Sequence, residues 1–217
     1  MVPHNLRHFA YLEVVKSFSP SDLVFCVDSR DLIFQLSPID IASTWMMNDQ
    51  VHVFDEGKRY FKGGCLQTFE RSAANLTWVQ DLLGVEHTPD FLIGDAKFVI
   101  NSGCIAGSSQ KLIELFTVTT QLLSGSPNSI WGLLDQAALN VAIYGEDRLK
   151  QGNVARIHPN GEVVLNMCGV IDERVDLIEG KLIRGDRAIP IVHQFDRFGI
   201  YSGIQGLNLS RRDYKVN

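Results

Sequence analysis

The sequence has few cysteines, no block of basic residues and no long apolar run, and each absence excludes a class of protein. Only four of the 217 residues are cysteine, and none forms a Cys-x-x-Cys pair, so neither a disulfide framework nor a zinc site is expected. The 20 basic side chains are outnumbered by 25 acidic ones and form no cluster, which argues against nucleic acid as a partner. No stretch approaches the roughly 18 consecutive apolar residues that a membrane span needs.

The composition that remains is that of a folded α/β protein. Hydrophobic residues make up 45% of the chain and charged residues 21%, which is enough to bury a core and excludes wholesale disorder. No linker composition or internal repeat interrupts the chain, so we expect a single domain over residues 1–217. Gly-x-Gly-x-x-Gly is absent, which removes the dinucleotide-binding fingerprint. The unpaired cysteines favour a reducing, cytoplasmic location.

Apolar patterning predicts alternating helices and strands. Residues 7–18 carry an apolar helical stripe, and Leu23–Val27 is a continuous apolar run of the kind found in parallel strands buried on both faces. Further helices are expected over 75–83, 108–123 and 135–144, and further strands over 51–54, 97–100, 154–157, 162–167 and 189–192. This order predicts an α/β fold with a mixed, mostly parallel central sheet and flanking helices. In such sheets ligands bind beyond the carboxyl ends of the strands.

Four short polar segments follow or head these elements. They are Asp28–Asp31, Asn101–Gly103, Asp135-Gln136 and His193–Arg197. Each has an ordinary structural reading on its own, as a helix cap, a turn, a carboxylate in the first turn of a helix or a structural histidine. Their succession along the chain is more specific than any one of them.

In this order the segments resemble the GT-A fold glycosyltransferases, which use nucleotide-sugar donors, and in particular the glycogenin-like transferases. A related GT-A-like group with an Asp-x-Arg-Asp motif is more similar still. The resemblance spans about residues 7–197 and rests on four stretches, VFCVDSRDLIF, FVINSGCIAG, LLDQAALN and IPIVHQFDR.

The resemblance implies a divalent cation, Mn²⁺ or Mg²⁺, held by Asp28 and His193. Asp28 is also expected to contact the donor. The usual acidic motif is Asp-x-Asp, whereas here Arg30 stands at its second acidic position. Arg30 is expected either beside the diphosphate or paired with a local carboxylate such as Asp31. Asp31 is the weaker metal candidate, because residues 28 and 31 face apart on an extended strand unless the chain bends between them.

The same resemblance assigns the remaining site residues to the donor. Asn101 and Ser102 are expected to hydrogen-bond the donor sugar, and Arg197 to lie near the diphosphate. Asp135 and Gln136 are the expected catalytic pair at the reacting face of the sugar.

The implied activity is transfer of a hexose from a nucleotide-sugar, with UDP as the expected nucleotide, to a hydroxyl of a glycan or another acceptor. Only 27 residues precede Asp28, where GT-A enzymes have further βα units. We therefore expect a GT-A-like domain that is incomplete on its N-terminal side. A dimer or a second chain would complete it, or it is a fragment of a longer protein, for which the Golgi lumen is the alternative location.

Two other functions stay open at this point. One is a catalytically silent GT-A-like domain that binds ligands or partners, since fold alone does not confer activity. The other is a hydrolase that uses Asp28, Asp135 and His193 for acid–base chemistry.

Overall fold

The structure is a computed structural model, and it describes residues 1–46, 49–60, 71–87, 89–93, 97–145, 155–167 and 175–194. The helices in these ranges are α1 (Pro3–Val15), α2 (Pro38–Trp45), α3 (Arg71–Leu83), α4 (Asp90–Ile93), α5 (Ser109–Gly125), the 3₁₀ helix η2 (Pro127–Ile130) and α6 (Asp135–Tyr144). The strands are β1 (Leu23–Val27), β2 (Leu32–Phe34), β3 (Val51–Arg59), β4 (Phe98–Ser108), β5 (Ala155–His158), β6 (Val164–Asn166), β7 (Val175–Ile178), β8 (Lys181–Arg184), β9 (Arg187–Ala188) and β10 (Ile191–His193).

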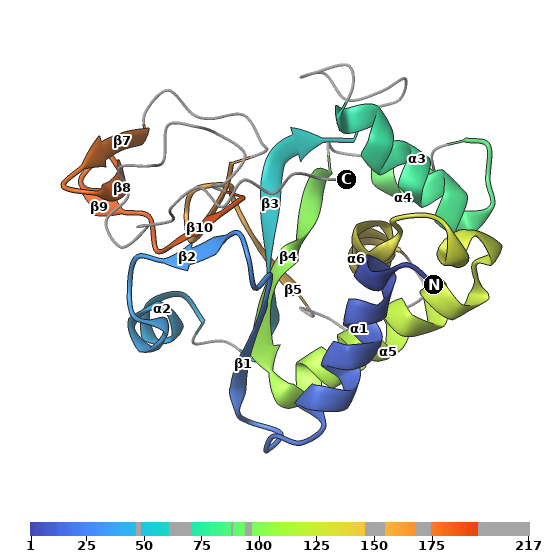
Figure 1. The fold of residues 1–217 in the computed structure, drawn as a ribbon, viewed down its shortest axis with the longest axis horizontal. Helices are drawn as coiled ribbons and strands as arrows, with labels where there is room; N and C mark the ends of the chain where they lie inside the picture. The colour runs from blue at the N-terminus through green and yellow to red at the C-terminus, as the bar shows by residue number, and fades with distance from the viewer. Residues whose placement is uncertain are drawn as a thin grey trace, which may run out of the picture.

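A four-stranded sheet in the order β1-β4-β3-β5 forms the middle layer (Figure 1). Its central strand, β4, pairs antiparallel with β1 on one side and with β3 on the other, and only β5 joins in a parallel sense. A second sheet, β2-β10-β6, and a small hairpin sheet, β7-β8-β9, complete the strands of the described ranges. The α/β class with mixed sheets and flanking helices is therefore confirmed.

The expectation of a mostly parallel sheet is wrong. Among the described residues, five strand pairings are antiparallel and two are parallel, namely β3 with β5 and β10 with β6. The apolar run of β1 misled the prediction, because this strand is covered on both faces while pairing antiparallel. Val24 and Cys26 pack into one hydrophobic cluster, and Phe25 and Val27 pack into another. Burial on both faces, and not strand direction, produced the continuous apolar pattern.

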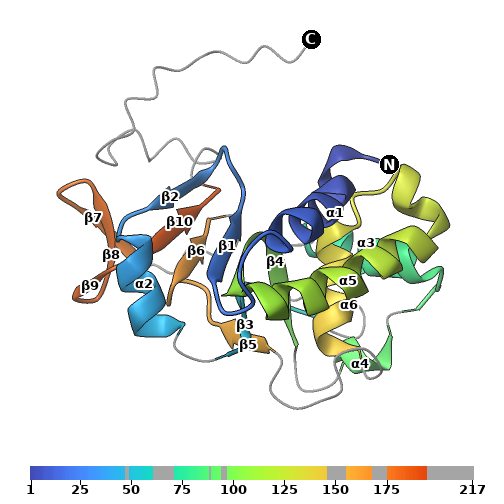
Figure 2. The ribbon, with the colours of Figure 1, turned by 90° about the horizontal axis from the view of Figure 1, so that it is seen from below.

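One face of the central sheet is covered by helices α1, α5 and α6, which Figure 2 shows as a single layer beside β4. Their apolar side chains, including Leu112, Phe116 and Leu139, form the larger cluster with β4 and β3. Ser108 caps α5 through its hydroxyl, which accepts a hydrogen bond from the Lys111 amide. A strand therefore passes directly into a helix that turns back across it.

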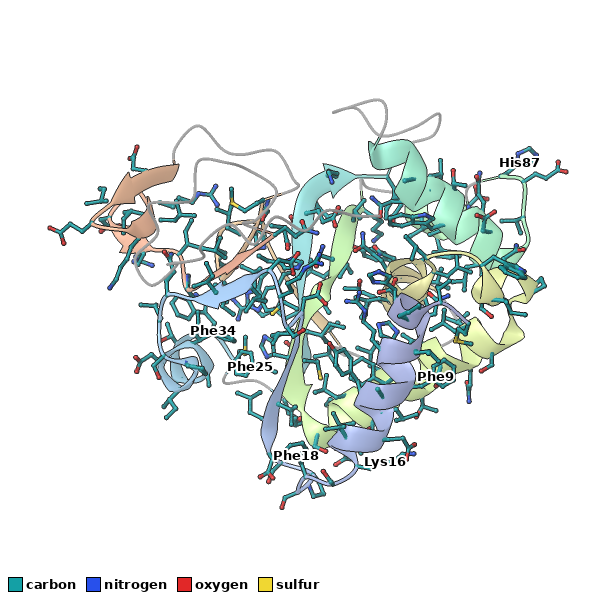
Figure 3. All side chains as sticks on the ribbon, viewed as in Figure 1. Phe9, Lys16, Phe18, Phe25, Phe34 and His87 are labelled. Atoms are coloured by element: carbon teal, nitrogen blue, oxygen red, sulfur yellow. The ribbon has the colours of Figure 1, made fainter. Side chains whose placement is uncertain are left out.

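The second sheet and α2 cover the opposite face. Phe25 of β1 and Phe34 of β2 meet edge-to-face with their ring centroids 6.1 Å apart, and Figure 3 shows both rings between the two layers. Ser37 caps α2 and Pro38 occupies its first turn, which fixes the start of this helix. The central sheet is thus the middle of three layers.

Strand β4 is longer than its sequence predicts. A strand was expected over 97–100 with a turn at Asn101–Gly103, but β4 continues without a break to Ser108. The polar residues Asn101 and Ser102 are therefore buried in the middle of a central strand.

Two of the four cysteines, Cys26 and Cys104, are buried free thiols, as expected. Burial raises the pKa of Cys26 to about 12 and also raises the pKa of Cys104, so both stay protonated and unreactive at neutral pH. Within the described ranges, no helix combines the length and hydropathy needed to cross a bilayer.

Candidate functional site

Polar side chains from several separate elements line one pocket of about 460 Å³ where β1 and β10 end. The lining residues are His4, Arg7, Asp28, Glu56, Lys58, Ala74, Asn75, Trp78, Asn101, Ser102, Gly103, Leu133, Asp135, Gln136, His193 and Gln194. Six of the residues predicted from sequence are in this set. They are Asp28, Asn101, Ser102, Asp135, Gln136 and His193.

Asp28, Asp31 and His193 form a group whose ligand atoms all lie within 4.8 Å of one another. The chain bends through residues 29–31 between β1 and β2, so Asp28 and Asp31 do not face apart as an extended strand would require. His193 Nε2 lies 3.2 Å from Asp28 Oδ2 and 3.8 Å from Asp31 Oδ1. Asp31, the weaker candidate in the sequence, therefore stands beside the two stronger ones.

The second nitrogen of His193 has a fixed partner. Asn166 donates its Nδ2 to the Asp55 carbonyl at 2.8 Å, which turns its Oδ1 toward His193 Nδ1 at 2.7 Å. His193 Nδ1 therefore carries the proton, and in the neutral ring Nε2 presents a lone pair to the Asp28 carboxylate. Such an arrangement requires a positive charge between the two groups, either a proton on Nε2 or a metal cation.

Gly103 allows the approach of Asp28 and His193. A Cβ at this position would lie 2.5 Å from His193 Nε2 and 2.7 Å from Asp28 Oδ2, and closer still to His193 Cε1. Real Cβ atoms do not approach other atoms so closely, so only glycine fits. The Gly103 carbonyl also accepts a hydrogen bond from the Asp28 amide at 2.8 Å, which continues the β1–β4 ladder to the site.

Arg7 of α1 bridges two carboxylates of the pocket. Its Nη1 lies 2.6 Å from Asp28 Oδ1 and its Nε lies 3.1 Å from Asp135 Oδ2. Its Nη2 lies 2.8 Å from Nδ1 of His4, one turn earlier on the same helix. Burial alone raises the pKa of Asp28, but the hydrogen bond with His193 and the charge of Arg7 outweigh it, so this pKa is lowered.

A buried network of amide and charged groups forms the floor. Glu56 Oε1 accepts hydrogen bonds from Asn101 Nδ2 at 2.8 Å and Gln136 Nε2 at 3.1 Å, while its Oε2 pairs with Lys58 Nζ at 3.0 Å. Gln136 Nε2 also lies 2.7 Å from Asn75 Oδ1. This network fixes the rotamers of Asn101, which the resemblance assigned to the donor, and of Gln136, which it assigned to catalysis.

Ser102 joins β4 to the start of α6. Its hydroxyl donates to Asp135 Oδ2 at 3.0 Å, and its backbone amide donates to Gln136 Oε1 at 3.2 Å. Asn140, one turn later in α6, bonds both the amide and the carbonyl of Ile100 at 2.9 and 2.8 Å. These bonds hold the first turn of α6 against the strand, so the positions of Asp135 and Gln136 are set by backbone contacts.

Two predicted site residues are not part of this assembly. Arg30 is exposed and does not line the pocket, because it lies in the bend after β1. Arg197 lies outside the described residues.

Sequence reasoning missed Arg7, Glu56 and Lys58. Glu56 and Lys58 pair at 3.0 Å, but no regular alternation marks them in the sequence, because the pairing of β3 with β4 is irregular between Asp55 and Arg59. β3 was expected to end at Phe54, whereas it continues through Gly57, whose φ of +69° suits glycine. Arg7 carried no local signal, because its partners lie 21 and 128 residues away in the chain.

No protein-family model matches the chain, and no curated protein matches it. Among solved structures it is similar to the apo structure of the WbbM bifunctional glycosyltransferase, at 13% sequence identity and a TM-score of 0.42. The match covers 86% of this chain and 31% of that one, so the chain spans under a third of the length of that protein.

Proposed function

We propose that the pocket binds a nucleotide-sugar together with a divalent cation, and that the chain transfers the hexose to a hydroxyl acceptor. The observation that carries this proposal is the convergence of Asp28, Asn101, Asp135 and His193 on one pocket. These residues come from four distant segments, which are the segments expected to meet in a GT-A-like transferase.

The donor set of Asp28, Asp31 and His193 fits Mn²⁺ or Mg²⁺. Carboxylates and an imidazole are suitable ligands for Mn²⁺, whereas Mg²⁺ would be held mainly through the two carboxylates. A cation held by Asp28 and His193 would supply the positive charge that otherwise requires a proton on His193 Nε2. A cation bound here would neutralise charge on the departing diphosphate.

The residues beside this group would orient the sugar. The hydroxyl of Ser102 and the carboxylate of Asp135 form one polar edge of the pocket, and the amides of Asn101 and Gln136 form another. Because these side chains are held by protein partners before any ligand arrives, little reorganisation is needed on binding. Trp78 adds an apolar wall of the kind on which sugar rings and bases pack.

Calorimetric titration with UDP and with UDP-hexoses, each with and without Mn²⁺, tests the proposal. We expect UDP to bind in the presence of Mn²⁺ and Asp28→Asn to weaken this binding at least tenfold, because the variant removes a charged ligand. Asp186→Asn is the matched control, since Asp186 lies in the exposed turn between β8 and β9 and its side chain is 95% exposed. Transfer to a hydroxyl acceptor is then monitored by measuring the UDP that is released.

Equal UDP affinity in the wild type and Asp28→Asn would refute the site. UDP binding without turnover on any acceptor would favour the alternative, a catalytically silent binding domain. One observation favours that alternative, namely that Arg7 already satisfies both Asp28 and Asp135, as a structural ion-pair network would.

A further inference from the structure

The two oxygens of the Asp28 carboxylate have different partners. Oδ1 lies 2.6 Å from Arg7 Nη1, and Oδ2 lies 3.2 Å from His193 Nε2. Arg7 is only 17% exposed and Asp28 only 28% exposed, so water screens this pair less than it screens a surface ion pair. The carboxylate that is central to the proposed cation site is therefore already compensated by a fixed positive charge.

A divalent cation bound by Asp28, Asp31 and His193 would share the Asp28 carboxylate with the Arg7 guanidinium. Two like charges a few ångströms apart in a partly buried site repel each other strongly. Arg7 is also held at a second point, because its Nε bonds Asp135 Oδ2 at 3.1 Å. It can therefore lose its contact with Asp28 and still stay in the pocket.

We infer that Arg7 is a built-in counter-ion that keeps the affinity of the site for a free divalent cation low and makes cation binding depend on an anionic diphosphate. This inference rests on the proposed function. Without ligand, Arg7 balances Asp28 and opposes the cation. A bound diphosphate supplies negative charge to both the cation and Arg7, so the repulsion is relieved and the two ligands bind cooperatively. Cooperativity of this kind is reciprocal between the two ligands.

The test measures the Kd of Mn²⁺ for the full chain from the electron paramagnetic resonance signal of free Mn²⁺, with and without saturating UDP. We expect Arg7→Gln to tighten Mn²⁺ binding about tenfold in the absence of UDP. The factor by which UDP tightens Mn²⁺ binding should fall to a similar extent. Lys16→Gln is the matched control, because it removes one positive charge at the C-terminal end of α1, where Lys16 pairs with Glu13. It should leave both quantities within twofold of the wild type.

Arg7→Lys separates charge from geometry. Lysine keeps the positive charge but lacks the guanidinium fork that reaches two carboxylates. Because the charge is retained, the Mn²⁺ affinity of the Arg7→Lys chain should stay within about threefold of the wild type. Tightening of Mn²⁺ binding by about tenfold in Arg7→Lys would overturn the counter-ion role, and this result is informative even if Arg7→Gln does not fold. Unchanged or weaker Mn²⁺ binding in a folded Arg7→Gln chain would overturn it as well.

Asp28→Asn in the same titration distinguishes failure of this inference from failure of the proposed function. If Asp28→Asn abolishes Mn²⁺ binding while Arg7→Gln leaves it unchanged, the cation site stands and the role of Arg7 is refuted. If Mn²⁺ binds Asp28→Asn as well as it binds the wild type, or binds none of the chains, the cation site itself is refuted, and the role of Arg7 with it.

Discussion

Gly103→Ala is the sharpest structural test of the site, because the structure leaves no room for a methyl group at Gly103. The new Cβ would lie 2.5 Å from His193 Nε2 and 2.7 Å from Asp28 Oδ2, so one of these side chains must move. His193 is 1% exposed and its ring is held by Asn166 at 2.7 Å. Asp28 is held by Arg7 at 2.6 Å. Neither neighbour is a free side-chain end that could give way at little cost.

We expect two consequences of Gly103→Ala. Overpacking of this kind costs about 1–3 kcal/mol of folding free energy. For a chain of this size that corresponds to a fall in Tm of roughly 2–4 °C per kcal/mol. Separation of Asp28 from His193 should also weaken Mn²⁺ binding by at least tenfold, because two of the three ligands no longer converge.

The assay is thermal unfolding followed by circular dichroism, together with a Mn²⁺ titration. Gly125→Ala is the matched control, because a Cβ at Gly125, the last residue of α5, would meet nothing within 4 Å. This variant should be neutral, or stabilising by up to about 1 kcal/mol. A Gly103→Ala chain with the Tm and Mn²⁺ affinity of the wild type would refute the packing described for the site.

Two further predictions concern α1. Asn5→Ala should destabilise the fold by about 2–4 kcal/mol, because the buried Asn5 side chain bonds two carbonyls and one amide between η2 and the start of α6, and their loss leaves buried groups unpaired. The matched control is Asn128→Ala at an exposed position, which removes one hydrogen bond and should change the free energy of unfolding in urea by no more than about 1 kcal/mol. Burial lowers the pKa of His8 to about 4. In the unfolded chain His8 has its ordinary pKa of about 6.5, so as pH falls it is protonated there before it is protonated in the fold. Its protonation therefore favours the unfolded state as pH falls from about 6.5 toward 4, by up to about 3 kcal/mol. His8→Leu should flatten this part of the pH dependence of the urea midpoint, and an unchanged slope would contradict the assignment.

Part of the lining of the candidate pocket could be predicted from sequence, because the signals that mark the end of β1 and the start of α6 are local. Strand β1 ends at Val27, directly before Asp28, and α6 begins at Asp135, as the apolar pattern of each segment predicts. Each of these features is set within a few residues by apolar periodicity and a following polar group. These two ends needed no knowledge of strand direction to be recognised, whereas Asn101 and Ser102 lie within β4 and mark no end.

The features that the sequence did not predict depend on contacts between distant parts of the chain. Strand direction was wrong because burial on both faces of β1 comes from two separate clusters, and no local pattern states which strand supplies the neighbour. The bend that brings Asp31 to His193 is fixed by the hydrogen bond from the Gln194 amide to the Asp31 carbonyl. Arg7 needed the same kind of information, since α1 is placed at the pocket by packing on α5 and α6, which lie far from it in the sequence.

The hydrogen bond between Asp28 and His193 joins residues 165 positions apart, and that between Asn5 and Leu134 joins residues 129 positions apart. During synthesis on the ribosome, α1 and β1 therefore emerge long before their partners in the pocket exist. Contacts of such high sequence separation form late, because the entropy of closing a long loop must be overcome first. The proposed cation would need Asp28 and His193 together, so it would bind only the nearly finished fold, where it would slow unfolding without assisting the early steps of folding.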